Sequence, residues 1–381
     1  MSDLSFAPSP PAPAPALPLL TSDDVVARMK ALPNVRCIVT RVDPAEAVVV
    51  VLPRNLDLAT RFYATTHTVP PRILPLEPGI ELGGKIPCLF SNGDLWGEGG
   101  YAPTFLRALE LGIAAEVQID YAAIQPVLRF FISTQPFPAQ FVIDNIERIT
   151  RCCNALADQH SRDVFLGGIK YRLTGDSGFM PFSNLHQYFH EQVQVAPGDF
   201  VYEAGISTGG EDLTIEFSKS VGPLGRVYAF EADLAVIDPL ATALAPRHNV
   251  RLEPVGLWSE AATLPFNHGE HGDSRVLRQG EGNAVCSLIS LDSHVAAQPE
   301  QRCDFIKFDI EGAEPEALRG SVETLRRLRP KLAISVYHEP FEQFVEILDY
   351  LVNLDLGYRF YLSHHAPYRY ETILYGQPPA A

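Results

Sequence analysis

Apolar and polar positions follow a regular alternation in the second half of this 381-residue chain. Short apolar and β-branched runs, typical of strands, occur at 200–204, 226–230, 250–257, 305–308, 332–337, 358–362 and 372–375. Between most of these runs lie segments with helical periodicity, at 213–221, 235–244, 315–328 and 341–354. Strands that alternate with helices through short turns predict a doubly wound, mostly parallel sheet with helices on both faces.

Two segments depart from this alternation. Residues 259–302 are polar and are expected to hold loops and a hairpin. The last two strand signals are separated only by residues 363–371, which is too short for a helical crossover. We therefore predict one antiparallel strand near the C-terminus of an otherwise parallel sheet.

The first half has a less regular pattern. Ser22, Asp23 and Asp24 can cap a helix that runs to residue 32, and β-branched runs at 37–40 and 47–52 predict two strands. The second run is apolar enough to be buried on both faces. Helical periodicity returns at 102–111, at 122–133 and most strongly at 140–171. The predicted domains are a tail at 1–20, a small α/β domain at 21–135, a helical connection at 136–195 and the large sheet at 196–381.

Composition restricts the location and the partners of the protein. Hydrophobic residues make up 46%, and 30 basic against 46 acidic side chains give a net charge of −16, which argues against nucleic-acid and anionic-membrane partners. Prolines are frequent in residues 1–20, which carry no secretory signal and cannot form a membrane helix, so a disordered, polyproline-like tail is expected. The six cysteines include no C-x-x-C pair and are expected to be reduced and buried. We expect a cytoplasmic protein.

An acidic, glycine-rich turn follows the first strand of the predicted large sheet. It contains Glu203, Gly205, Ser207 and Gly209. A dinucleotide fingerprint would need a second glycine at position 207, so a nicotinamide-dependent oxidoreductase is disfavoured, and no P-loop is present. An acidic residue followed by glycines suits a cationic amino-acid ligand: Glu203 can meet its amino group while Gly205 and Gly209 leave room for it.

A second carboxylate, Glu231, ends the next strand. It stands 26 residues beyond Gly205, where it can accept hydrogen bonds from both ribose hydroxyls of an adenosine. The alternative is a solvated acid at a strand end. The glycine turn at the matching position favours the nucleoside interpretation.

The fourth strand leads into further candidate residues. Asp309 and Glu311 follow it, and His338 follows the fifth strand, so all three should lie at the carboxyl edge of the sheet, where ligands bind in such folds. Lys307 shares a face with Asp309, which leaves a structural ion pair and catalysis open. Glu314 is expected to cap or to complement the charge of the helix that Pro315 begins.

These residues resemble the FkbM family of S-adenosylmethionine-dependent methyltransferases. The resemblance covers about residues 198–376 and is most specific in the segment Ile310-Glu311-Gly312-Ala313-Glu314; further matches surround Glu231 and the two last strands. It implies a class I methyltransferase fold and methyl transfer to oxygen, often on sugars or secondary metabolites. Glu203 departs from the aspartate that is usual in the family.

The resulting hypothesis is an O-methyltransferase that binds S-adenosylmethionine, releases S-adenosylhomocysteine and acts on a small-molecule or glycan acceptor. His338 is the expected base, because an imidazole titrates near neutral pH, and Asp309 or Glu311 would orient the acceptor. A divalent metal bound by these three side chains is a less favoured alternative. A degenerate protein that binds the nucleoside or a partner without catalysis remains the alternative function, suggested by Glu203.

Overall fold

The structure is a computed structural model of the whole chain. It describes residues 17–31, 36–40, 48–66, 68–83, 85, 87–90, 107, 111, 116–120, 139–174, 179–181, 183, 186–206, 211–269, 274–278, 280, 282–338, 343–365 and 370–380. None of the helices formed by these residues is both long enough and apolar enough to cross a membrane. The predicted helical segments at 102–111 and 122–133 lie almost wholly outside the described residues.

The front half contains a five-stranded sheet in the order β1-β5-β4-β2-β3. Its elements are β1 (Arg36–Thr40), β2 (Val48–Val51), the short helix η1 (Pro53–Asn55), α2 (Leu56–Thr66), β3 (Arg72–Pro75), β4 (Pro87–Leu89) and β5 (Glu116–Asp120). All strand pairs are parallel. The four valines of β2 are buried on both faces, as the sequence predicts, and α2 covers the sheet through Tyr63.

The first helix, α1 (Ser22–Ala31), begins at Ser22 itself, one residue earlier than a cap at Ser22 predicts. Thr21 takes the capping position: its hydroxyl accepts a hydrogen bond from the Asp24 backbone N–H at 3.2 Å, and the Asp24 carboxylate accepts one from the Thr21 N–H at 2.9 Å. This reciprocal pair is a capping box, which corrects the expectation that Ser22 begins the cap. Just before it, the Pro18 carbonyl accepts a hydrogen bond from Arg162, and Leu20 pairs with Asn154.

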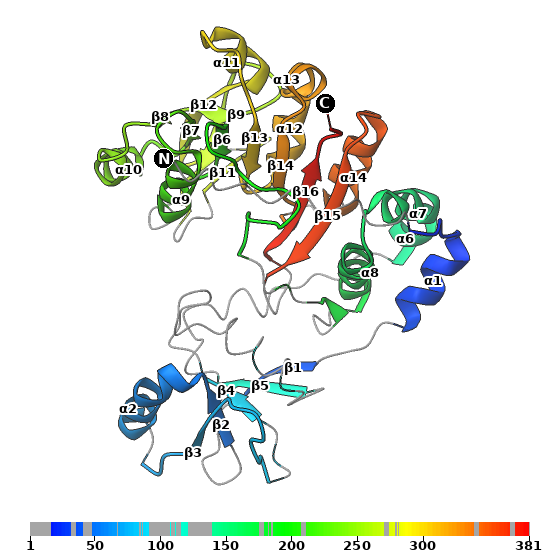
Figure 1. Cartoon of the computed structure of the whole chain (residues 1–381), viewed down its shortest axis with the longest axis vertical. Helices are drawn as coiled ribbons and strands as arrows, with labels where there is room; N and C mark the ends of the chain where they lie inside the picture. Colours follow the sequence, from blue (N-terminus) through cyan, green and yellow to red (C-terminus); the bar gives the residue numbers. More distant parts are fainter. Residues whose placement is uncertain are drawn as a thin grey trace, which may run out of the picture.

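Three helices fill the strongest periodic segment, α6 (Ala139–Asp144), α7 (Ile146–Ala155) and α8 (Gln159–Thr174). Their apolar side chains share one core with the large sheet of the second half. Ser161 accepts a hydrogen bond from the Leu362 backbone, and Asp349 accepts hydrogen bonds from Arg148 and Arg151 at 2.7 and 2.6 Å. Figure 1 shows these helices beside β15 and α14 (Gln343–Asn353), so they cover the sheet as well as connecting two segments.

The second half is built on a seven-stranded sheet in the order β15-β16-β14-β13-β6-β7-β8. The strands are β6 (Phe200–Ala204), β7 (Arg226–Phe230), β8 (Val250–Glu253), β13 (Phe305–Phe308), β14 (Lys331–Ser335), β15 (Arg359–His364) and β16 (Thr372–Gln377). Only β16 runs antiparallel to its neighbours in this sheet. The predicted doubly wound sheet with one antiparallel strand is confirmed.

Helices cover both faces of this sheet because side chains along each strand alternate between the faces. One face packs against α9 (Glu211–Val221) and α10 (Ile237–Leu244), through residues such as Phe217 and Leu240. The other face packs against α7, α8 and α14, together with α11 (Leu291–Ala297), α12 (Glu314–Arg319) and α13 (Val322–Leu328). The five cysteines with described side chains, Cys88, Cys152, Cys153, Cys286 and Cys303, are buried free thiols, as expected.

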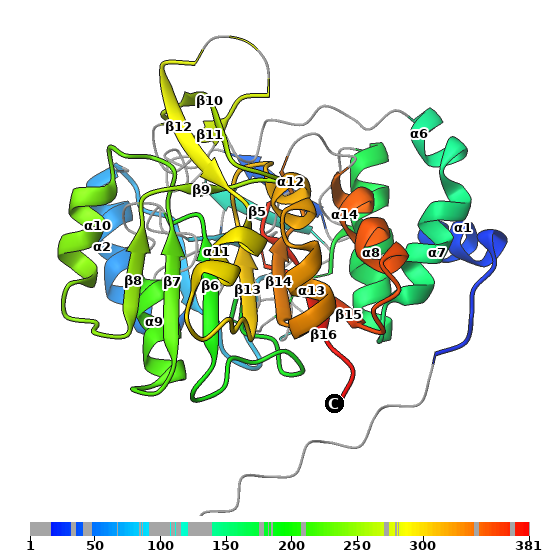
Figure 2. The same ribbon diagram turned by 90° about the horizontal axis from the view of Figure 1, so that it is seen from above.

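A small second sheet occupies the polar segment between β8 and β13. It has the order β11-β10-β12-β9, formed by β9 (Gly256–Leu257), β10 (Ala262–Asn267), β11 (Arg275–Val276) and β12 (Ala284–Ile289). Antiparallel pairing of the consecutive strands β10 and β11 confirms the expected hairpin, and β12 pairs antiparallel with the other side of β10. Figure 2 shows this sheet beyond the end toward which the arrows of β7 and β8 point, which is the carboxyl edge of the parallel strands.

Candidate functional site

The predicted cofactor-binding side chains gather at the carboxyl edge of β6 and β7. Glu203 is the last residue but one of β6, Gly205 follows that strand directly, and Glu231 follows β7. Ser207 and Gly209 lie outside the described residues. Three of the five predicted cofactor residues, Glu203, Gly205 and Glu231, therefore lie at one edge of the sheet.

Gly205 brings the end of β6 against the end of β13. Its φ of +85° lies in the left-handed region, and a Cβ built on it would lie 1.7 Å from the carbonyl oxygen of Asp309. A side chain cannot fit there without moving one of the two strand ends. A glycine is therefore required here by a close backbone contact, in addition to the reason inferred from the sequence, which was room for a ligand.

Glu231 fastens the glycine turn to the second strand. One carboxylate oxygen accepts the Ile206 backbone N–H at 2.9 Å, and the other accepts the Asp233 N–H at 2.6 Å. Burial raises the pKa of Glu231, and these two backbone hydrogen bonds oppose that rise. Each oxygen keeps a second lone pair, so the carboxylate can still accept hydrogen bonds from a ligand.

Glu203 is buried at the centre of the sheet with one oxygen unsatisfied. Its Oε2 has no hydrogen-bond partner among the described residues, and its Oε1 lies 3.9 Å from the Nζ of Lys307. Burial raises the pKa of Glu203, and the nearby Lys307 ammonium opposes the rise. An unpaired buried carboxylate oxygen costs folding free energy of roughly 1–3 kcal/mol or more, which marks the position as one that suits a hydrogen-bond donor.

Lys307 holds the carboxylates of two strands together. It stands opposite Glu203 in the pairing of β13 with β6, and it donates a hydrogen bond to the Gly205 carbonyl at 2.7 Å. Its Nζ lies 3.9 Å from both Glu203 Oε1 and Asp309 Oδ2. Of the two alternatives that the sequence left open, these contacts support the structural ion pair.

Asp309 is held by two tyrosines. Its Oδ2 accepts the Tyr188 hydroxyl at 2.8 Å, and its Oδ1 accepts the Tyr337 hydroxyl at 2.9 Å. Burial by itself would raise the pKa of Asp309, but Lys307, His338 and the tyrosine hydrogen bond together hold it below its ordinary value. Asp309 is therefore a carboxylate at neutral pH, with its position fixed from both sides.

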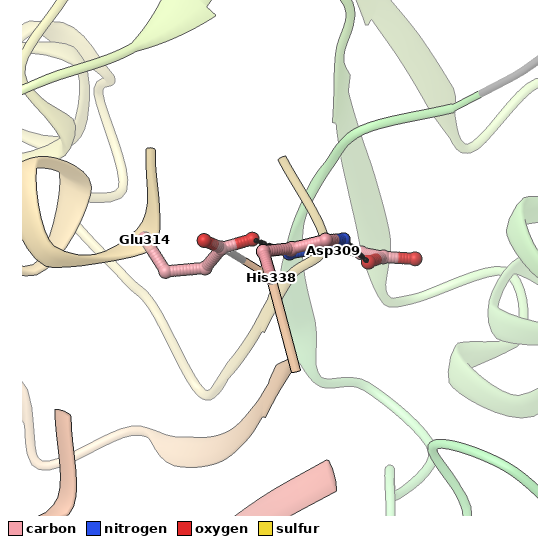
Figure 3. Close-up of side chains that lie close together, drawn as sticks. All are labelled: Asp309, Glu314 and His338. Carbon is pink, nitrogen blue, oxygen red and sulfur yellow. Dashed lines mark hydrogen bonds and ion pairs between the residues drawn. The ribbon is translucent and has the colours of Figure 1, made fainter. Parts of the chain in front are cut away.

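His338 lies between carboxylates at the end of β14. Figure 3 shows its ring with Glu314 on one side and Asp309 on the other. Its Nδ1 is 2.8 Å from Glu314 Oε1, and its Nε2 is 3.6 Å from Asp309 Oδ1 and 3.5 Å from Glu311 Oε2. The three side chains predicted for the acceptor side, Asp309, Glu311 and His338, are thus brought together.

The surroundings of His338 correct the reason for choosing it as the base. Burial lowers the pKa of an imidazole, but Glu314 and Glu311 outweigh burial and raise the pKa of His338 well above its ordinary value. The expected titration near neutral pH is therefore wrong for this arrangement. Its Nδ1 donates a hydrogen bond to the Glu314 carboxylate, which fixes the orientation of the ring.

Glu314 was missed by the sequence argument as part of this cluster. It is fully buried and makes no side-chain cap of its own helix; its two oxygens accept the backbone N–H groups of Ile310 and Gly312 at 2.9 and 3.0 Å. The chain can fold back in this way because Glu311 and Gly312 both have positive φ, +53° and +99°. The expected capping role is corrected: Glu314 shapes the preceding turn and holds His338.

Two further side chains of the site carried no sequence signal for function. Tyr188 comes from the segment before β6, and its hydroxyl contacts both Asp309 and Ser335, at 2.8 and 3.0 Å. Glu371 precedes β16 and is hydrogen-bonded by Gln187. Burial, followed by the charge of Asp309, raises the pKa of Glu371 to about 8.

A family model matches this part of the chain. Residues 199–360 match the methyltransferase FkbM domain, which confirms the resemblance found in the sequence. The match lies within the second half of the protein and includes the large sheet from β6 to β14. No curated protein sequence matches the chain.

Solved structures agree on the fold. The crystal structure of methyltransferase FkbM from Methylobacillus flagellatus KT aligns with 93% of this chain and 92% of its own, at a TM-score of 0.52 and 18% identity. At this identity the likeness shows the fold alone. Aeropyrum pernix fibrillarin, solved with natively bound S-adenosyl-L-methionine, aligns with 48% of this chain and 68% of its own, at 16% identity and a TM-score of 0.33.

Proposed function

We propose that the protein is an S-adenosylmethionine-dependent methyltransferase and that the carboxyl edge of β6 and β7 binds this cofactor. The observation that carries the proposal is the buried, unpaired oxygen of Glu203 beside a glycine turn that Glu231 holds in place. The amino group of the methionine part is a suitable donor for Glu203, and the ribose hydroxyls are suitable donors for the free lone pairs of Glu231.

The charge of the site suits a cation. Glu203, Asp309 and Glu311 stand at the same edge with one lysine, Lys307, between the first two. When bound, S-adenosylmethionine supplies a methyl group on a positively charged sulfur, which these carboxylates would attract. The pyrophosphate of a nicotinamide dinucleotide would instead be repelled by them.

The acceptor side consists of Asp309, Glu311 and His338, and the acceptor that fits it is a hydroxyl of a sugar or secondary metabolite, as in the FkbM family. Carboxylate oxygens can accept hydrogen bonds from neighbouring hydroxyls and can take the proton that the attacking oxygen loses. A base so placed contributes roughly 10²–10⁴-fold to such a reaction, and alignment of the reacting atoms contributes more. Acidic side chains at the edge would exclude anionic acceptors.

The cofactor proposal is tested by calorimetric titration of S-adenosylhomocysteine and of NAD into the full chain. We expect binding of the first compound only. Glu231→Gln should weaken it by about 10-fold or more, since it removes a charged acceptor worth roughly 1.5–3 kcal/mol. Asp304→Asn is the matched control, because Asp304 also accepts a backbone N–H, from Phe200 at 2.8 Å, but stands at the opposite edge of the sheet.

Each result decides between the alternatives. Equal affinity of wild type and Glu231→Gln would remove Glu231 from the cofactor site, and binding of NAD alone would overturn the class of enzyme. Transfer of labelled methyl groups from S-adenosylmethionine into a metabolite extract would then show catalysis. A protein that binds S-adenosylhomocysteine but transfers no label to any extract, including glycan fractions, would be the degenerate alternative.

A further inference from the structure

One nitrogen of His338 is buried and unsatisfied, and it faces two carboxylates. The residue is 4% exposed, and its Nε2 has no hydrogen-bond partner among the described residues. The oxygens nearest to Nε2 are Oδ1 of Asp309 and Oε2 of Glu311, at 3.6 and 3.5 Å. These separations are too long for hydrogen bonds of ordinary strength.

These two distances are instead close to those between neighbouring ligand atoms that bind one metal ion. When nitrogen and oxygen ligands lie about 2.0–2.2 Å from one ion, neighbouring ligand atoms are roughly 3.0–3.5 Å apart, depending on the angle between them. The distance from Nε2 to Glu311 Oε2, 3.5 Å, lies at the upper end of this range, and the distance to Asp309 Oδ1, 3.6 Å, lies just above it. A small inward movement of either carboxylate would complete the arrangement.

Glu314 prepares the ring from the other side. Its Oε1 accepts the Nδ1 proton at 2.8 Å, while its own position is fixed by the N–H groups of Ile310 and Gly312. A carboxylate that binds the far nitrogen of a histidine orients the ring and raises the basicity of the nitrogen that faces the metal. Potential ligand atoms of Asp309, Glu314 and His338 all lie within 4.8 Å of one another, but the bonded Nδ1 leaves Nε2 as the ligand.

An ion can reach this cluster from solvent, because two of its carboxylates are partly exposed. The side chains of Asp309 and Glu311 are 25% and 32% exposed, whereas that of Glu314 is fully buried. Positive charge nearby comes from Lys307, whose Nζ lies 3.9 Å from the other oxygen of Asp309, so Oδ1 remains turned toward His338. The Tyr337 hydroxyl also contacts Oδ1 and would remain its second partner.

We infer that Asp309, Glu311 and His338 form a site for one divalent transition-metal ion, with Glu314 as the residue that positions His338. One imidazole and two carboxylates suit Mn²⁺, Fe²⁺ or Zn²⁺ better than Mg²⁺ or Ca²⁺, which prefer oxygen ligands only. Water or a hydroxyl ligand would complete the coordination. Binding of the ion does not depend on the proposed methyl transfer.

The test is titration of MnCl₂ into the full chain after removal of metal with a chelator. We expect one Mn²⁺ per chain, with affinity at least about 10-fold weaker in Glu311→Gln and lost in His338→Gln. Electron–nuclear double resonance of the bound Mn²⁺ should show a coupled nitrogen in the wild type and in Glu311→Gln. Glu316→Gln is the control, because Glu316 lies on the same helix as Glu314 and pairs with Arg319 and Arg278 instead.

Failure of this inference is separable from failure of the proposed function. Absence of Mn²⁺ binding up to about 1 mM, the weak end of divalent-ion sites in proteins, would overturn the metal site, as would equal affinity in wild type and both cluster variants. A bound Mn²⁺ without a coupled nitrogen would overturn the assignment of His338. Titration of S-adenosylhomocysteine into the same samples reports the cofactor site independently.

Discussion

At the scale of single residues, the site is a set of charges whose protonation is fixed by neighbours in three dimensions. Asp309 is held ionised by Lys307, His338 and the tyrosine hydrogen bond. For Glu371, which is also buried, burial and the charge of Asp309 raise the pKa and outweigh the opposing effects of Gln187 and His338. Two carboxyl groups in one region therefore have pKa values displaced in opposite directions. The sequence alone could not predict these opposite pKa shifts, because Glu371 is distant in the chain from all the groups that act on it.

Glu371 should make the stability of the protein depend on pH. Its pKa is about 8 in the folded protein and near 4.5 ordinarily, so the folded chain keeps a proton that the unfolded chain loses. The stability that it contributes is full below about pH 4.5, is lost as the pH rises and is gone above about pH 8. We expect Glu371→Gln, which mimics the protonated form, to unfold at a higher temperature than wild type at pH 8 and at the same temperature near pH 4.5.

The difference between the two proteins, on the order of a few kcal/mol at most, should be followed by thermal unfolding at several pH values. Glu323→Gln is the control, because Glu323 forms only an exposed ion pair with Arg326 and should show no such trend. Gln187, Asp309, Glu311 and His338 are the polar groups that act on Glu371. A gap that stays constant from pH 4.5 to 8 would contradict the displaced pKa.

At the scale of elements, hydrophobic patterns found the strands and therefore the positions at their ends. Glu203, Glu231 and Asp309 were predicted together because parallel strands end at one edge, and each strand was visible as an apolar run. Tyr188 could not be found in this way, since it comes from a segment without strand or helix periodicity. The role of Glu314 depended on a turn with two successive positive φ values, which the residue types permit but do not require.

The contact between the ends of β6 and β13 should make Gly205 sensitive to substitution. Gly205→Ala introduces a Cβ 1.7 Å from the Asp309 carbonyl oxygen at a positive φ. Gly198→Ala has a similar φ of +87° but nothing within 4 Å of its Cβ, so it measures the backbone strain alone. We expect Gly205→Ala to be less stable than Gly198→Ala by roughly 1–3 kcal/mol.

Urea unfolding of both variants provides the comparison, with S-adenosylhomocysteine affinity as a second measurement. Movement of the turn in Gly205→Ala should displace Lys307 and Ile206, which both contact it or its neighbours, and weaken binding. Gly198→Ala should bind as wild type does. If the two variants are equally stable and bind equally well, the close contact does not exist in solution.

At the scale of the whole molecule, the two halves of the sequence do not correspond to two independent cores. Helical periodicity correctly indicated helices in residues 140–171, but periodicity does not say what an apolar face covers. In the structure α7 and α8 share the core of the large sheet, and the α1 residue Val25 packs into it as well. The front sheet of β1 to β5 is formed separately, and Figure 1 shows it apart from the large sheet.

Shortened chains should reveal this organisation. A chain that begins at residue 180 lacks α7 and α8 and exposes the sheet face that Leu156, Phe165 and Ile169 cover, so we expect no cooperative unfolding transition. A chain that begins at residue 136 keeps these helices and should unfold cooperatively and bind S-adenosylhomocysteine, with some stability lost through removal of α1. Calorimetry and titration check both expectations, and cooperative unfolding with full affinity in the shorter chain would refute them.

The longer chain also tests a role for residues 21–135: if it keeps cofactor affinity but loses kcat/KM for the acceptor, the front sheet helps to select that acceptor. If kcat/KM is unchanged, the front sheet has no part in acceptor recognition.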